Sequence, residues 1–73
     1  MVKSIRTKEY QYFTEKLRKA RLEAGLTQVG VARKLNRPQS YISKVEAGEQ
    51  RIDVIELKKF AKLYKKNINY FIN

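Results

Sequence analysis

The chain has 73 residues, enough for one small domain, and its 17 Lys and Arg against 7 Asp and Glu give a formal net charge of +10, which favours a polyanionic partner such as nucleic acid or an acidic membrane surface. It contains no cysteine and no histidine, which excludes a disulfide framework, a thiolate nucleophile, an imidazole base and a standard zinc site, so we expect no enzyme activity, no cofactor and no metal. The apolar runs are far shorter than the roughly 20 residues that a membrane span needs, and the N-terminus lacks the apolar core of a signal peptide, so we expect a cytoplasmic protein.

The first predicted element is a helix that begins near Thr7, whose hydroxyl can cap the free N–H groups of a first turn. Apolar residues then recur at steps of three and four, which place them on one face of a helix. These residues are Tyr10, Phe13, Leu17, Ala20 and Ala24. Gly25 follows at the position where a left-handed residue ends a helix. We expect residues 1–6 to be a flexible N-terminal segment, which leaves 7–73 as the single folded domain.

The second helix is predicted from Thr27, its candidate N-cap, to about Leu35. Val31, Ala32 and Leu35 form its apolar side. Gly30 lies in mid-helix, where glycine costs about 1 kcal/mol relative to alanine, and close approach of another backbone is one explanation for it.

Asn36 and Pro38 separate this helix from the next one. Asn36 tolerates a positive φ, and Pro38 suits a first helical turn because proline has no N–H to lose. The third helix is predicted from about Gln39 to Ala47, with Ile42 and Val45 pointing inward together. Its opposite face is polar and has no carboxylate. The residues of that face are Gln39, Ser40, Ser43, Lys44 and Ala47.

Asp53 and Glu56 have the spacing of a capping box and predict the start of a fourth helix. The apolar stripe of this helix follows the i, i+3, i+4, i+7 pattern. It consists of Leu57, Phe60, Ala61 and Tyr64. Asn67 can cap a final short helix that carries Ile68 and Phe71. The fold class is therefore all-α, a compact five-helix bundle without a strand.

The stretch from Ala24 to Gly48 has a strongly positive charge balance, because Glu46 is its only acidic residue. Its basic residues are Arg33, Lys34, Arg37 and Lys44. The small Ala32 and the turn-forming Asn36 allow the third helix to cross the second closely at a steep angle. This pattern predicts a helix-turn-helix whose third helix is free to enter a major groove.

Two segments at fixed spacing, LTQ at 26–28 and QSYISKVEAG at 39–48, resemble the Xre family of phage-repressor and Cro-like helix-turn-helix proteins. The resemblance extends back over 17–25 and forward through 51–57 to the last helix, so it covers nearly the whole chain. It implies a lambda-repressor-like DNA-binding domain of five helices. It also implies a homodimer that binds a roughly palindromic operator.

The resemblance implies two kinds of DNA contact. Recognition helices of the family read base edges, and the matching residues here are Gln39, Ser40, Ser43 and Lys44. Glutamine can bridge adenine N6 and N7, lysine can donate to guanine O6 or N7, and serine can do either. Other family positions contact the sugar-phosphate backbone, and their matches are Gln28, Arg37, Tyr41 and Arg51. Gln28 is also expected to brace the recognition helix.

The resemblance further implies a buried ion pair between Arg21 and Glu46, which ties the first helix to the end of the third. Near the C-terminus, Tyr70, Phe71 and Ile72 either close the core or form an exposed apolar surface for dimerisation.

The chain departs from the family pattern at several turns and caps. Asn36 replaces the usual turn glycine, and Pro38 stands where a Ser or Thr cap is common. Lys65 and Lys66 replace the customary glycine and aliphatic residue before the last helix. These departures affect the caps and the C-terminal packing but not the register of the motif.

We therefore predict a sequence-specific double-stranded DNA-binding transcriptional regulator with no small-molecule ligand. Antitoxins, which have a toxin as protein partner, and restriction-modification controllers share this kind of fold, and the sequence does not decide among the three. An alternative of another class is a cationic module that binds RNA or a membrane surface through charge alone, in which the polar residues of the third helix would be interchangeable. The lysine-rich side of the fourth helix has two interpretations: it is a solvated face, or it attracts phosphates or an acidic partner.

Overall fold

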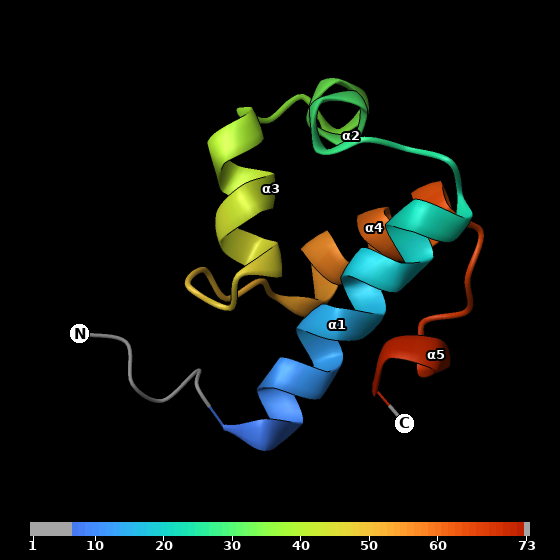
Figure 1. The fold of residues 1–73 in the computed structure, drawn as a ribbon. Coiled ribbons are helices and arrows are strands. Elements are labelled where there is room, and N and C mark those ends of the chain that lie inside the picture. The colour runs from blue at the N-terminus through green and yellow to red at the C-terminus, as the bar shows by residue number, and fades with distance from the viewer. Residues whose placement is uncertain (1–6, 73) are drawn as a thin grey trace.

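The computed structural model describes residues 7–72, which form five α-helices and no strand. The helices are α1 (Lys8–Glu23), α2 (Gln28–Leu35), α3 (Gln39–Glu46), α4 (Val54–Tyr64) and α5 (Asn69–Ile72) (Figure 1). The predicted all-α fold class is thereby confirmed. The segment 1–6, for which we predict flexibility, lies outside the described residues. Within 7–72 no helix is both long and apolar enough to cross a membrane.

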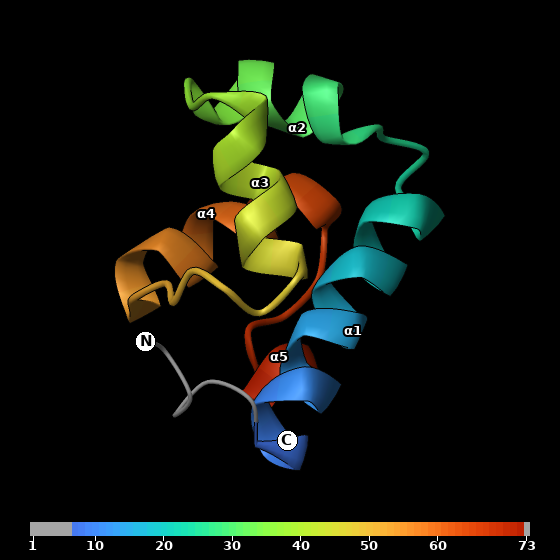
Figure 2. The same ribbon diagram turned by 60° about the vertical axis from the view of Figure 1, so that its left-hand side comes forward.

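The arrangement of the helices leaves one side of α3 open. Helix α1 packs against α3, α4 and α5, while α2 packs mainly against α3. In Figure 1 α2 is viewed end-on and α3 lies in the plane of the picture, so their axes cross at the steep angle that the sequence predicts. Figure 2 shows α3 across the front of the molecule, with no helix between it and the viewer. The helix is therefore supported from behind and accessible from the front.

Side-chain caps begin three of the helices at the predicted residues. The side-chain oxygens of Thr7, Thr27 and Asp53 each accept a hydrogen bond from the backbone N–H three residues later, at 3.1, 3.0 and 2.8 Å respectively. Each bond satisfies an N–H group that the first turn of a helix leaves unpaired, and a cap of this kind contributes about 1 kcal/mol. The starts of α1, α2 and α4 are thus set by single residues.

The cap of α2 also explains Gly30. A Cβ atom built on Gly30 would lie 3.3 Å from the Thr27 Oγ1 atom, which is the acceptor of the Gly30 N–H. A larger residue would have to displace this hydroxyl by a few tenths of an ångström. The close neighbour is therefore the capping side chain of the same helix and not a second backbone.

The first four helices are followed by residues with left-handed backbone. The φ angles are 72° at Gly25, 57° at Asn36, 78° at Gly48 and 57° at Lys65. Lys65 occupies the position where the family has glycine, and a lysine in this conformation carries a strain of about 1 kcal/mol. Pro38 corrects one expectation, because it precedes the first helical turn as an extended N-cap residue (φ −65°, ψ 151°) and offers no side-chain cap.

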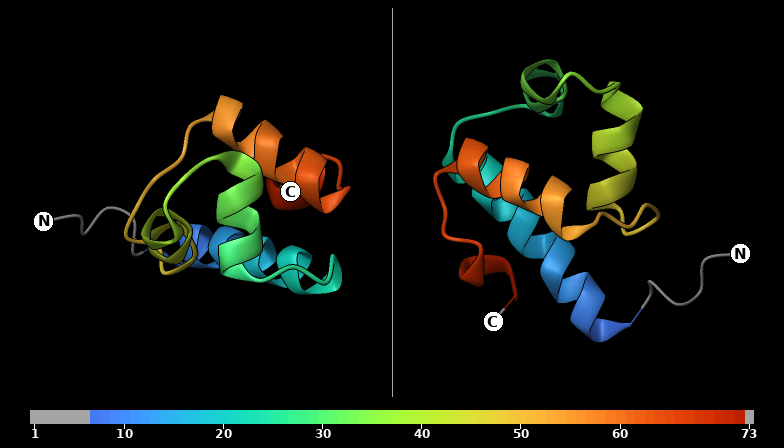
Figure 3. Two further views of the ribbon diagram at one scale, coloured as in Figure 1. Left: turned by 90° about the horizontal axis from the view of Figure 1, so that it is seen from above. Right: turned by 180° about the vertical axis from the view of Figure 1, so that it is seen from behind.

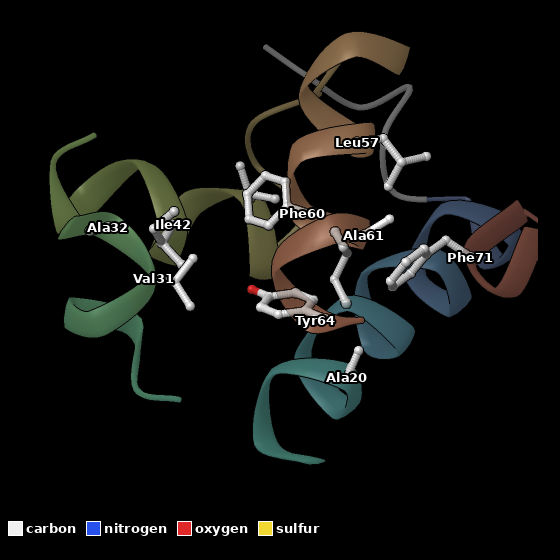
Figure 4. Packing of buried hydrophobic residues seen from close by; sticks show 11 residues of the cluster. Ala20, Val31, Ala32, Ile42, Leu57, Phe60, Ala61, Tyr64 and Phe71 are labelled. Atoms are coloured by element: carbon white, nitrogen blue, oxygen red, sulfur yellow. The ribbon is translucent and has the colours of Figure 1, made fainter. Parts of the chain in front are cut away.

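The hydrophobic core takes residues from all five helices (Figure 4). Its largest fully buried side chains are Phe60, Leu17, Ile42, Val31 and Val45. These residues belong to the apolar stripes predicted for α1 to α4. The prediction for Ala24 is wrong, because α1 ends at Glu23 and Ala24 is an exposed C-cap residue.

The C-terminal helix closes the core. The Asn67 Oδ1 atom accepts a hydrogen bond of 2.8 Å from the N–H of the first residue of α5, as predicted for a cap. Phe71 is 2% exposed and belongs to the core, so of the two alternatives given for it, closure of the core describes the single chain. Tyr70 is half-buried, and its carbonyl oxygen accepts a 2.8 Å hydrogen bond from Lys16 Nζ. Only Ile72 of the three is exposed.

Candidate nucleic-acid interface

Helices α2 and α3 form a tight unit joined by a short turn. Ile42 and Val45 on α3 are fully buried and belong to the same core cluster as Val31 on α2. The turn closes where the backbone N–H of Arg37 donates to the carbonyl oxygen of Ala32 at 2.9 Å, a hydrogen bond made possible by the left-handed residue between them. Because both inward residues of α3 are fixed, its outward residues have a defined direction.

The side of α3 opposite to Ile42 and Val45 is exposed and polar. Its side chains are those of Gln39, Ser40, Ser43 and Lys44. Glu46, at the end of the same helix, has only 5% of its side chain exposed and does not contribute a free negative charge to this face. The face therefore offers hydrogen-bond donors and acceptors together with a positive charge.

The predicted ion pair between Arg21 and Glu46 is present and is bidentate. Arg21 Nε lies 2.7 Å from one Glu46 carboxylate oxygen, and Arg21 Nη2 lies 3.1 Å from the other. The third donor, Arg21 Nη1, bonds to the carbonyl oxygen of Leu26 at 3.0 Å. The hydrogen bond to Glu46 raises the pKa of the Arg21 guanidinium above its ordinary value. This charged pair ties the end of α3 to α1 and to the segment before α2.

A chain of hydrogen bonds continues from this ion pair to the start of α3. Gln28 Nε2 donates to a Glu46 oxygen at 3.1 Å, and Gln39 Nε2 donates to Gln28 Oε1 at 3.1 Å. The Glu46 carboxylate fixes the direction of both bonds, because a carboxylate only accepts hydrogen bonds. Gln28 must therefore present its amide nitrogen to Glu46, which leaves its oxygen to accept from Gln39. Gln39 keeps its Oε1 atom and one N–H for an external partner. Gln28 thus braces the recognition helix, as the resemblance implies.

A second polar cluster connects the turn to α4. The Glu56 carboxylate accepts from Arg37 Nη2 at 2.8 Å and from the Tyr41 hydroxyl at 3.3 Å. The Arg37 guanidinium also lies 4.7 Å from the centre of the Tyr41 ring. Two of the expected phosphate contacts are therefore held together by an acidic residue of the neighbouring helix.

The electrostatics of this cluster favour its charged form. Burial alone would raise the pKa of the Glu56 carboxyl, but the hydrogen bond from Arg37 and the positive charges of Arg37 and Lys59 hold this pKa below its ordinary value. Burial raises the pKa of the Tyr41 hydroxyl, and the charge on Glu56 adds to the effect. Tyr41 is therefore a protonated donor beside an ionised carboxylate. Since 41% of the Arg37 side chain is exposed, its remaining donors can bind an external anion.

Arg51 lies in the loop between α3 and α4, apart from this cluster. Its guanidinium is 5.4 Å from the centre of the Tyr10 ring at the start of α1. The expected phosphate contacts thus form three groups. Gln28 lies beside Gln39, Arg37 beside Tyr41, and Arg51 beside Tyr10.

Sequence reasoning missed the role of Glu56, for which it predicts only a capping box. The Asp53 half of that box is present, but the Glu56 carboxylate reaches Arg37 and Tyr41 instead of its own helix start. The opposite charges of Arg37 and Glu56 are the only signal in the sequence that points to this contact. Among residues 7–72 no group of three His, Cys, Asp or Glu side chains is arranged to hold a metal ion.

Two short helices crossing at a tight turn, the second exposed along a polar edge, define a helix-turn-helix DNA-binding unit. A family model described as helix-turn-helix matches residues 17–71, and the chain belongs to this family, which is of the Cro and Xre type. The family binds DNA and is not typically enzymatic. A search of curated proteins found no match.

Proposed function

We propose that the protein is a transcriptional regulator that recognises a specific sequence of double-stranded DNA by placing α3 in the major groove. The observation that carries this proposal is the outer face of α3, where polar and basic side chains project from a helix that its buried residues hold in one orientation. The major groove admits an α-helix and presents a distinct pattern of donors and acceptors for each base pair. Regulation by occupancy requires no catalytic group.

The geometry of α3 supports readout by two residues in particular. Gln39 retains one acceptor and one donor after bonding to Gln28, the pair of atoms needed to bridge adenine N6 and N7. Lys44 can donate to guanine O6 or N7, while Ser40 and Ser43 can donate or accept. Each good base contact discriminates against the wrong base by about 1–3 kcal/mol.

Contacts to phosphates supply most of the affinity in this proposal. Gln28 is the first residue of α2, where free backbone N–H groups attract an anion. Arg37 keeps side-chain donors for a phosphate at the start of α3, whereas the Tyr41 hydroxyl has to turn its one hydrogen from Glu56 to the phosphate. Arg51 follows α3 in the next loop. With a net charge of +10, binding is expected to weaken steeply as salt concentration rises.

A homodimer is supported by an apolar groove between the starts of α1 and α4 and helix α5. The groove has a volume of about 540 Å³ and includes the exposed side chains of Tyr12, Val54 and Ile72. Exposed apolar side chains that gather on one face mark a protein contact surface. A two-fold axis at this face would pair it with itself. Helix-turn-helix dimers bind half-sites about 34 Å apart on the DNA. Of the three residues named from the sequence for a dimer surface, Phe71 and Ile72 line this groove, and residues of α1 and α4 complete it.

Selection of bound duplexes from a random pool at near-physiological salt tests the proposal. We expect a consensus with two related half-sites, because two copies of α3 would read the same bases in opposite orientation. A selected pool without any consensus contradicts sequence-specific recognition. A consensus with a single half-site contradicts the proposed homodimer but not sequence-specific recognition.

Substitutions separate this proposal from binding by charge alone. The double variant Gln39→Ala and Lys44→Ala is expected to lose more affinity for the selected duplex than for a scrambled one. Lys58→Ala removes the same charge from an exposed position of α4 and serves as the control. Equal losses on both duplexes in the double variant favour the nonspecific alternative.

A further inference from the structure

A groove that borders the turn residue Asn36 but includes none of the proposed DNA-contacting residues has an unusual lining. It lies between the end of α2 and the second half of α4 and has a volume of about 620 Å³. We call it the lysine groove, after the residues Lys34, Lys59, Lys62 and Lys65, which line it with Leu35 and Leu63. In both panels of Figure 3 the second half of α4 lies on the opposite side of the molecule from α3. No residue of α3 lines the lysine groove.

The lysine groove carries more positive charge than the acidic groups and helix ends around it neutralise. None of its lining residues is acidic, and within 7–72 no ion pair involves Lys34, Lys62 or Lys65. Lys59 lies 3.5 Å from Glu56. The ends of α2 and α4 contribute about half a negative charge each through the helix dipole. The two helix ends together offset about one of the four lysine charges, and Glu56 offsets one more. About two positive charges therefore remain without a negative partner, so the lysines do more than complement the helix ends.

The floor of the lysine groove is apolar. Leu35 and Leu63 are half-buried and pack against the core, so they form a fixed surface beneath the ammonium groups. A sugar-phosphate backbone offers little apolar surface to cover such a floor, whereas a peptide can place carboxylates and large apolar side chains side by side. A second hollow of about 580 Å³ shares Lys34, Leu63 and Lys65 with the first and extends it past the end of α4 to Leu26. Its one acidic lining residue, Glu23, is paired with Lys66 at 2.9 Å.

We propose that the lysine groove binds an acidic segment of a partner protein. The carboxylates of this segment pair with the lysines, and its apolar side chains cover Leu35 and Leu63. The position of the groove leaves the outer face of α3 open, so the partner and the DNA can be bound together. This proposal goes beyond DNA recognition and does not depend on it.

Titration of the ¹⁵N-labelled protein with a synthetic acidic peptide tests the proposal. The probe is a helical peptide with leucines on one face flanked by glutamates, and its controls replace either the leucines by serine or the glutamates by glutamine. We expect amide shifts confined to residues 34–36 and 59–65, and weaker binding of both controls. Shifts centred on residues 39–44, or shifts spread over all lysines, overturn the proposal. Binding of anionic phospholipid vesicles but not of the peptide at residues 34–36 and 59–65 also overturns it.

A pair of double variants makes the test quantitative. Lys34→Gln with Lys62→Gln removes two charges from the lysine groove, and Lys8→Gln with Lys58→Gln removes two exposed charges elsewhere. The first pair is expected to weaken peptide binding by a factor of about 1.4 to 5 per lysine, the range of exposed ion pairs. The second pair is expected to bind like the wild type, and both are expected to keep their preference for the selected duplex. Equal loss of peptide affinity in the two pairs refutes a specific groove.

Discussion

The ion pair between Arg21 and Glu46 is the interaction whose removal is expected to cost the most stability. Replacing Glu46 by alanine removes both carboxylate acceptors of Arg21 and one acceptor of Gln28. The Arg21 side chain is only 9% exposed, so its charge would remain largely out of water without a partner. We therefore expect the free energy of unfolding to fall by about 3–5 kcal/mol. For 73 residues the total is about 4–11 kcal/mol, so this loss brings the domain close to unfolding.

Urea unfolding followed by helical circular dichroism measures this loss. A decrease below about 1 kcal/mol, the range of exposed ion pairs, would refute the assignment of a buried brace. The exposed pair between Glu23 and Lys66, with atoms 2.9 Å apart, is the matched control, and Glu23→Ala is expected to leave the urea midpoint nearly unchanged. The double variant Arg21→Met and Glu46→Leu is expected to recover most of the stability, because it buries no unpaired charge.

The same double variant separates folding from recognition. It lacks the Glu46 carboxylate that orients Gln28, and through Gln28 the amide of Gln39. We expect a folded protein with a reduced ratio of affinities for selected and scrambled duplexes. An unchanged ratio would show that the hydrogen-bond chain does not direct Gln39.

Three further predictions concern single residues. The pKa of the Glu56 carboxyl in the folded protein lies below its ordinary value of 4.5. The stability that the Glu56 carboxylate contributes is therefore complete above pH 4.5 and is lost as the pH falls through the folded pKa. Glu56→Gln is expected to flatten this acidic part of the stability curve, measured by urea unfolding at a series of pH values. Lys65→Gly is expected to raise the free energy of unfolding by up to about 1 kcal/mol, because glycine adopts the positive φ of 57° without strain. Ile72→Asp is expected to shift sedimentation from dimer to monomer while the helical content stays the same.

Each of these predictions has a result that contradicts it. Equal acidic slopes in wild type and Glu56→Gln would remove the cluster with Arg37 as a source of stability. A less stable Lys65→Gly variant would mean that the lysine side chain contributes more than its backbone strain costs. An unchanged sedimentation profile of Ile72→Asp would place the dimer interface elsewhere.

The helix boundaries were predictable because their causes are local. Thr7, Thr27 and Asp53 each accept from an amide three residues away, and a pattern of that length is visible in the sequence. The inward residues of α3 were predictable for the same reason, since Ile42 and Val45 lie three residues apart on an otherwise polar helix. Ala24 was misplaced because periodicity does not show at which residue a helix stops.

The polar contacts of the site were less predictable because they join distant parts of the chain. The pair of Arg21 and Glu46 follows from the resemblance to a family and not from any local pattern. Arg37 and Glu56 are 19 residues apart, and their contact depends on how the turn of the motif packs against α4. Composition reveals such charges but not their partners.

The way α3 is anchored has a consequence for how its target can change. Its attachment to the domain depends on the buried Ile42 and Val45, whereas Ser40, Ser43 and Lys44 are exposed. Substitutions at these three exposed positions therefore carry little energetic penalty for the rest of the molecule. If the proposed function holds, new sequence preferences can evolve, or be engineered, by exchanging these side chains on an unaltered scaffold.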